Sequence, residues 1–133
     1  MISSLLLRVS VTLLLIGMVF GIVMGIRQDF SLAPAHAHLN LVGFVVMFAA
    51  GLYYRIIPEA AESLLAKTQA ALHIVGSVVF PIGIAVTLIK GPGHEAGAII
   101  GSLIVLAATV LFAIVVFRTT ALARAPMPLP RRA

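Results

Sequence analysis

The chain has no cysteine and no tryptophan among its 133 residues. The absence of cysteine excludes disulfide bonds, thiolate zinc sites, iron–sulfur clusters and covalent c-type heme attachment, because each of these needs sulfur ligands or anchors. Histidine is therefore the only strong nitrogen ligand available to a metal. Charged residues are also scarce, at 10% of the chain.

Hydrophobic residues are abundant instead. They make up 62% of the sequence, and the mean hydropathy is +1.19. Both values lie far outside the range of soluble globular proteins, so the composition predicts an integral membrane protein whose main partner is the lipid bilayer. A chain of 133 residues holds four spans of roughly 20 residues each and leaves none for a separate soluble domain.

Four apolar segments are long enough to cross a bilayer. They cover approximately residues 9–26, 37–57, 69–89 and 96–117, and Pro or Gly interrupts the chain between them. The expected fold class is an all-α transmembrane bundle of four helices. Residues 118–133 form a basic, proline-rich tail, which we expect to be disordered beside an anionic membrane surface. No nucleic-acid partner is expected.

The basic residues are divided unevenly between the two sides of the membrane. Seven fall on one side and two on the other: Arg8, Arg55, Lys67, Arg118, Arg124, Arg131 and Arg132 against Arg27 and Lys90. The positive-inside rule then predicts that both termini are cytoplasmic, in a multi-pass protein of the bacterial inner membrane. An alternative treats residues 1–35 as a cleaved signal peptide, although the apolar stretch is long enough to span.

Two histidines stand at the start of the second apolar segment. Ionisable side chains at membrane depth are costly, so His36 and His38 suggest a functional site, and we interpret it as a metal centre. Residues two apart on a helix differ by about 200° in direction, so one metal ion cannot bind both. His36 shares its face with Asn40 and Gly43, and the small Gly43 would leave room for a flat macrocycle.

The run from His36 to Glu59 resembles the heme-ligating helices of subunit I of the heme-copper oxidases and nitric oxide reductases. The resemblance rests on eight residues: His36, His38, Asn40, Leu41, Tyr53, Tyr54, Pro58 and Glu59. In that family a His-x-His pair serves two hemes on opposite faces of one helix. The resemblance implies that His38 is a low-spin heme ligand, that His36 binds a second heme, and that each chain holds one or two hemes b.

The chain also departs from this family. The family's catalytic subunit has twelve spans in three arcs of four, so this chain resembles a single arc. It lacks the additional adjacent histidines, and the His with a downstream Tyr, that hold copper and reduce oxygen there. Copper therefore ranks behind heme as a cofactor. The resemblance implies a possible oxidoreductase component similar to cytochrome c oxidase or nitric oxide reductase, and it identifies no catalytic residue.

A single arc could complete a heme pocket by associating with further copies of itself. Homo-oligomers usually close with cyclic symmetry, so we expect a dimer or trimer that packs through glycine-rich helix faces. Small-xxx-small repeats provide such faces at Gly17, Gly21, Gly25, Gly97 and Gly101. The alternative interpretation is that these glycines pack helices within one chain.

The second axial ligand must come from the same side of the membrane as His38. His94 and the His38 of another copy are the candidates, whereas His94 could also serve only in the cap of the fourth helix. If the chain turns near Ala61, His73 lies about 11 residues, or roughly 16 Å, from the level of His38. We expect His73 to be a buried, hydrogen-bonding residue, and Arg27 and Lys90 to pair with heme propionates.

These residues predict a b-type heme protein that transfers electrons, with a redox partner in the respiratory chain, or that binds a diatomic gas such as NO or O2. An alternative is a cofactor-free or copper-handling accessory subunit of a respiratory membrane complex. A third is a small proton or ion conductor, but the second helix is entirely apolar between Asn40 and Tyr53.

Overall fold

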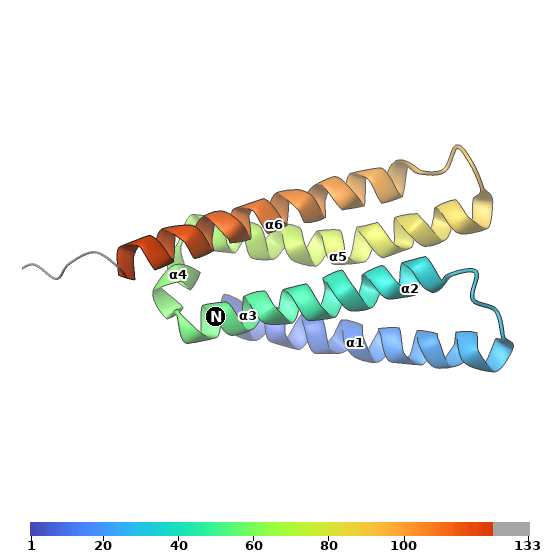
Figure 1. Ribbon diagram of the computed structural model, residues 1–133, viewed down its shortest axis with the longest axis horizontal. Coiled ribbons are helices and arrows are strands. Elements are labelled where there is room, and N and C mark those ends of the chain that lie inside the picture. Colours follow the sequence, from blue (N-terminus) through green and yellow to red (C-terminus); the bar gives the residue numbers. More distant parts are fainter. Residues whose placement is uncertain (124–133) are drawn as a thin grey trace, which may run out of the picture.

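The computed structural model describes the backbone of residues 1–123 and the side chains as far as Thr119. The elements follow in the order α1 (Ile2–Arg27), α2 (Ala33–Asn40), η1 (Leu41–Val46), α3 (Met47–Ile56), α4 (Pro58–Glu62), α5 (Leu64–Lys90) and α6 (Ala96–Ala123), as Figure 1 shows. Segment η1 is π-helical and joins α2 to α3 in one continuous span. The described residues contain no strand.

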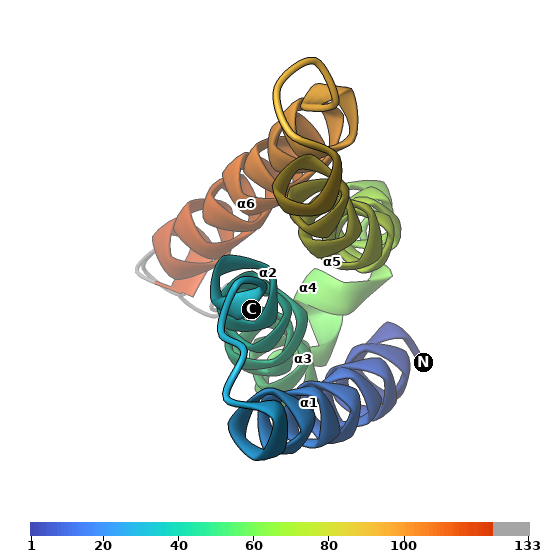
Figure 2. The same ribbon diagram turned by 90° about the vertical axis from the view of Figure 1, so that its right-hand side faces the viewer.

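The long helices form two antiparallel hairpins that lie side by side (Figures 1 and 2). The first pairs α1 with the α2–η1–α3 span, and the second pairs α5 with α6, which is the most extensive packing in the molecule. The α2–η1–α3 span also packs against α5, so these two spans form the centre of the bundle. The N-terminus and the described end of α6 lie at the same end (Figure 1).

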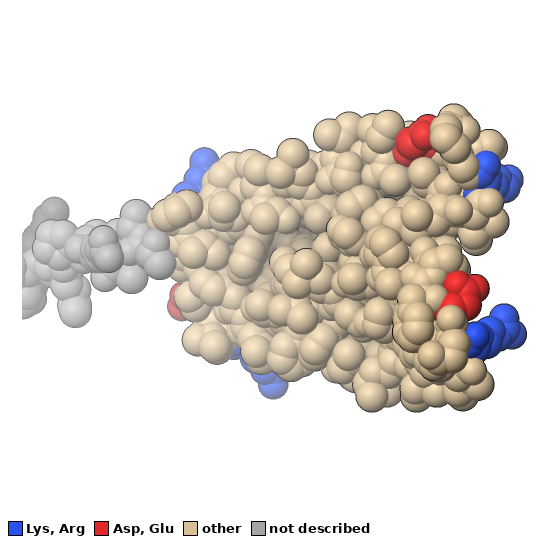
Figure 3. All heavy atoms as spheres, turned by 45° about the vertical axis from the view of Figure 1, so that its right-hand side comes forward, with Lys and Arg blue, Asp and Glu red and all other residues tan. Residues whose placement is uncertain are grey.

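Four of the helical stretches are long and apolar enough to cross a membrane: Ile2–Arg27, Ala33–Ile56, Leu64–Lys90 and Ala96–Thr119. Within an 18-residue apolar stretch of each span, 17% of the residues are buried in the first and last spans, against 33% and 28% in the two inner spans. Most apolar side chains therefore face outward. On the face shown in Figure 3, charged residues lie toward the two ends and the middle has none. This is the surface that a bilayer requires, and it confirms the predicted class of four-helix membrane protein.

The helices are longer than the apolar segments predicted. α1 begins at Ile2 instead of residue 9, and α5 begins at Leu64 instead of residue 69. The added residues 2–8 and 64–68 mix apolar and polar side chains, and the helical backbone continues through them. Ser63 caps α5 by accepting the Ala66 N–H at 3.1 Å. α6 continues to Ala123, six residues beyond the predicted end, and residues 124–133 of the predicted tail lie outside the described part of the chain.

The glycine repeats pack helices within the chain. A Cβ atom on Gly101 would lie 2.5 Å from the Phe80 Cα of α5, and Gly97 lies against Gly83. On α1, Gly17 and Gly21 face the side chains of the second span, whereas Gly25 has open space around it. Four of these five glycines thus pack helices within the chain, and association of further copies through the same faces stays a prediction.

Candidate functional site

The two histidines of α2 face different neighbours. Pro34 starts this helix with its fixed φ, and the His36 N–H donates to Leu32 O at 3.0 Å in the first turn. The His36 ring then lies edge-on to Phe20 of α1 at 5.8 Å, while the His38 ring lies edge-on to Phe80 of α5 at 4.8 Å. The predicted division of the pair between two sides of the helix is confirmed.

The His38 imidazole is oriented as a metal ligand would be. Its Nδ1 lies 2.8 Å from the backbone oxygen of Pro34. A carbonyl oxygen only accepts, so Nδ1–H donates, and the lone pair of the ring is left on Nε2. Metal-binding histidines typically donate their other ring N–H to a carbonyl or carboxylate, which fixes both tautomer and ring orientation. The His38 residue is partly exposed.

His36 and Asn40 lie together against the glycines of α1. The Asn40 Nδ2 is 3.2 Å from His36 Nε2 and 3.3 Å from His36 Nδ1. A side chain at Gly17 would collide with the Asn40 amide, and a Cβ at Gly21 would lie 2.9 Å from the His36 ring. Both side chains therefore occupy space that only glycine leaves free.

This arrangement leaves a buried polar atom without a partner. The Asn40 Oδ1 is buried and accepts no hydrogen bond within the described residues. His36 and Asn40 also line a shallow groove of about 480 Å³, with Gly21 and the apolar residues Leu14, Met18 and Ile22. Because Oδ1 lies against Gly17 and has no exposed surface, a ligand in this groove would not reach it.

The other predicted ligand residues are less closely associated with this turn. Gly43 is buried, and a Cβ there would lie 3.0 Å from Leu13 Cδ1, so Leu13 of α1 fills the space that we expected a macrocycle to use. His94 is exposed in the loop between α5 and α6, with its Nδ1 3.3 Å from Gly91 O. Within the described residues, no three His, Cys, Asp or Glu side chains are grouped to hold a metal ion.

Arg27 and Lys90 lie at the same end of the bundle as the start of α2, and both are exposed. Two carboxylates share this end. The Ser31 N–H donates to Asp29 Oδ1 at 3.0 Å and lowers the pKa of Asp29, and the Gly93 N–H donates to both Glu95 oxygens and lowers the pKa of Glu95. Both groups are thus held as carboxylates, and the end carries charges of both signs.

A buried chain of polar residues crosses from α3 to α5. The Tyr54 hydroxyl donates to Gln69 Oε1 at 3.1 Å, Gln69 Nε2 lies 3.2 Å from His73 Nδ1, and His73 Nε2 lies 3.1 Å from Val42 O. Ser77 Oγ donates to the same Val42 oxygen at 3.3 Å. The buried, hydrogen-bonding role expected of His73 is confirmed, whereas sequence reasoning missed its partners. The spacing of Gln69, His73 and Ser77 by four residues was the available signal.

The depth expected for His73 was wrong. His73 contacts Val42, one turn beyond His38, and His38 contacts Phe80, seven residues after His73. These contacts put His73 roughly 6 to 10 Å from the level of His38 instead of 16 Å. The second span ends at Ile56, and the short helix α4 occupies the region where we expected the turn, so the two spans meet in a different register.

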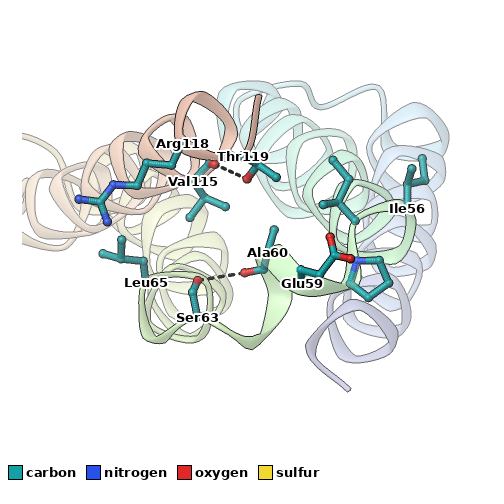
Figure 4. A pocket seen from close by; sticks show the side chains of 10 residues that line it. Ile56, Glu59, Ala60, Ser63, Leu65, Val115, Arg118 and Thr119 are labelled. Atoms are coloured by element: carbon teal, nitrogen blue, oxygen red, sulfur yellow. Dashed lines mark hydrogen bonds between the residues drawn. The ribbon is translucent and has the colours of Figure 1, made fainter. Parts of the chain in front are cut away.

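A pocket of about 600 Å³ lies at the opposite end of the bundle (Figure 4). Three of its polar side chains are already engaged or turned aside, and the Glu59 carboxylate also lines it. Ser63 and Thr119 donate to carbonyls of their own segments, Ala60 O and Val115 O, and Arg118 points away from the hollow. None of the four histidines lines this pocket.

Comparisons with protein-family models, with curated proteins and with solved structures found no match to this chain.

Proposed function

We propose that this protein binds heme b in the bacterial inner membrane, with His38 as an axial ligand through Nε2, and that it transfers electrons or binds a diatomic gas. The observation that carries the proposal is the 2.8 Å hydrogen bond between His38 Nδ1 and Pro34 O. This bond leaves Nε2 unprotonated and aimed by the backbone, which is what an iron ligand needs. The resemblance of residues 36–59 to the heme-ligating helices of subunit I gives the proposal its cofactor.

The residues around His38 are compatible with a macrocycle. Phe80 meets the imidazole edge-on, and the apolar outward faces of the helices exclude water. Exposed Arg27 and Lys90 lie at the same end of the bundle, where cationic side chains would pair with propionates. When bound, heme supplies one-electron chemistry and an iron site for a diatomic ligand, and the protein orients the ring and excludes water.

The second ligand to the same iron is not His36. His36 points to α1 and His38 to α5, so His36 serves the Asn40 groove on the other side of the helix. We propose His94 or the His38 of a second copy as the sixth ligand, in a dimer or trimer. Because Gly17 and Gly101 are buried within the chain and Gly97 lies against Gly83, such an oligomer would use surfaces other than these three glycines.

The test is the visible spectrum of protein purified in detergent from heme-replete cells, oxidised and then reduced with dithionite. Wild type is expected to show a sharp reduced α-band. His38→Ala is expected to lose it and to regain it when imidazole is added, because free imidazole can replace the missing side chain at the iron. Rescue by imidazole distinguishes ligation from a folding role.

His94→Ala is the matched variant, since it removes a histidine from an exposed loop. A change of ligation state in that variant identifies His94 as the second ligand, and an unaltered spectrum favours the His38 of another copy. The pyridine hemochrome ratio then decides between one heme per chain and one heme shared by two copies. A colourless wild type would contradict the heme proposal and favour the copper-handling or cofactor-free accessory subunit.

A further inference from the structure

The second span widens one turn beyond His38. Segment η1, Leu41–Val46, has π-helical geometry between the α-helical turns of α2 and α3. In a π turn each backbone hydrogen bond joins residues five apart instead of four, which is unfavourable in isolation. Such turns occur mostly as single insertions inside α-helices, frequently at functional sites. The widened turn therefore needs a stabilising partner.

That partner is α5. The Val42 carbonyl in η1 receives two side-chain hydrogen bonds, one from His73 Nε2 at 3.1 Å and one from Ser77 Oγ at 3.3 Å. Both donor side chains are almost completely buried, with 1% and 0% exposure. In a dry interior, each donor would be costly to leave unpaired, so the two bonds hold the carbonyl toward α5.

The Val42 carbonyl decides which nitrogen of His73 carries the proton, and the remaining members of the polar chain agree with it. A carbonyl accepts only, so His73 Nε2 carries the proton, and the lone pair on Nδ1 accepts from Gln69 Nε2. The Tyr54 hydroxyl in turn donates to Gln69 Oε1 and fixes the direction of that amide. Every member of the chain has a partner with neutral His73, so the network is fully satisfied in one tautomer.

We propose that His73 is a positioning residue for the heme-ligand turn. Through the Val42 carbonyl it holds η1 open, and so it sets the rotation of α2 relative to α3. If η1 reverted to ordinary α-helix while α3 kept its packing, α2 would turn by about 100°, the step of one residue. His38 would then leave Phe80, and Nε2 would no longer face the same space. This proposal rests on the proposed heme function.

The first test compares His73→Leu, His73→Gln and Tyr54→Phe. Leucine removes the donor to Val42, whereas the glutamine amide nitrogen can reach the position of Nε2 and preserve it. We expect His73→Leu to shift the reduced α-band and to lower heme affinity about tenfold or more, as loss of an orienting group typically does. His73→Gln should restore both.

Tyr54→Phe is the matched control. It removes a hydrogen bond from the same buried chain but leaves Val42 O untouched, so it should reduce thermal stability without moving the α-band. Equal spectral changes in Tyr54→Phe and His73→Leu would overturn the proposal, because the effect would then be one of bundle stability. Failure of His73→Gln to restore the band would overturn it as well.

A second readout separates this proposal from the proposed function. Amide hydrogen exchange across residues 41–47 reports the π turn directly, with or without heme. We expect faster exchange in His73→Leu than in wild type and near-normal exchange in His73→Gln. Should His73→Leu not fold, Ser77→Ala removes the weaker donor, with a smaller effect of the same sign. A colourless wild type refutes the heme function, and unchanged exchange refutes the positioning role.

Discussion

The four histidines of this chain have different environments, and the groups near each ring determine which of its nitrogens is free. His38 donates to Pro34 O and keeps a free nitrogen, whereas His73 has both nitrogens engaged in the core. His36 lies beside the Asn40 amide, and His94 is exposed in a loop. Residue type alone did not distinguish a metal ligand from a structural histidine, because the difference lies in what each ring nitrogen contacts.

Gly17 offers a prediction at the scale of one residue. Gly17→Ala should lower stability by roughly 1–3 kcal/mol, because the added Cβ collides with the Asn40 amide and overpacks the contact between α1 and α2. Gly25→Ala is the matched control, since nothing lies near its Cβ position and alanine favours helix. Thermal unfolding in detergent should rank Gly17→Ala below wild type and Gly25→Ala at or above it. The reverse order would mean that Asn40 does not occupy this space.

At the scale of elements, the hairpin of α5 and α6 depends on small residues. Gly83, Gly97 and Gly101 lie where the two helix backbones come close, and Gly76 faces Val105 of α6. Close backbone approach is the usual basis of helix association in lipid, where burial of apolar side chains gives little driving force. This is why the sequence repeats predicted tight packing correctly but could not say between which helices.

The two glycines at the closest crossing should respond unequally to the same change. A Cβ on Gly83 would collide with backbone atoms of Gly97 and Ala98, whereas one on Gly97 meets only the Gly83 Cα, at 3.1 Å. Gly83→Ala should therefore cost about 2 kcal/mol or more, and Gly97→Ala under about 1 kcal/mol. Melting temperatures in the same detergent check the difference. Equal losses would argue against this crossing point.

At the scale of the whole molecule, the four spans bring the N-terminus and the described end of α6 to one end (Figure 1). The described residues of that end include Arg8, Arg55, Lys67 and Arg118, and the other end has Arg27 and Lys90. The structure thus groups these six basic residues at the two ends as predicted from the sequence. From this grouping the positive-inside rule predicts that the end with both termini faces the cytoplasm.

Reporter fusions test this orientation. We expect a cytoplasmic fluorescent reporter to be active at both termini, and alkaline phosphatase, which needs an oxidising compartment, to be active only when inserted after Gly91 or between Gln28 and Ser31. As a control, replacing Arg55 and Lys67 with Gln should make the orientation less uniform, because it removes two of the seven positive charges expected on the cytoplasmic side. Phosphatase activity at the N-terminus would reverse the assignment.

The sequence was sufficient for the spans and for the directions of His36 and His38. Both follow from local patterns in the sequence. Hydropathy along the chain gives the spans, and the helical rotation of about 200° over two residues puts His36 and His38 on opposite faces. It was insufficient for the space near Gly43, which Leu13 of α1 fills, and for the depth of His73. Each of these errors depends on how one helix is shifted along another, and no local pattern encodes that shift.

The sequence by itself determined that this protein is a four-helix membrane bundle without cysteine chemistry, because composition and apolar length fix how a chain meets a bilayer. Only the tertiary structure decided that Val42 would share its carbonyl with His73 and Ser77, and that the second span would widen there. The physical reason is that a backbone carbonyl is the same in every residue. Its second partner is chosen only when another helix brings a donor to it.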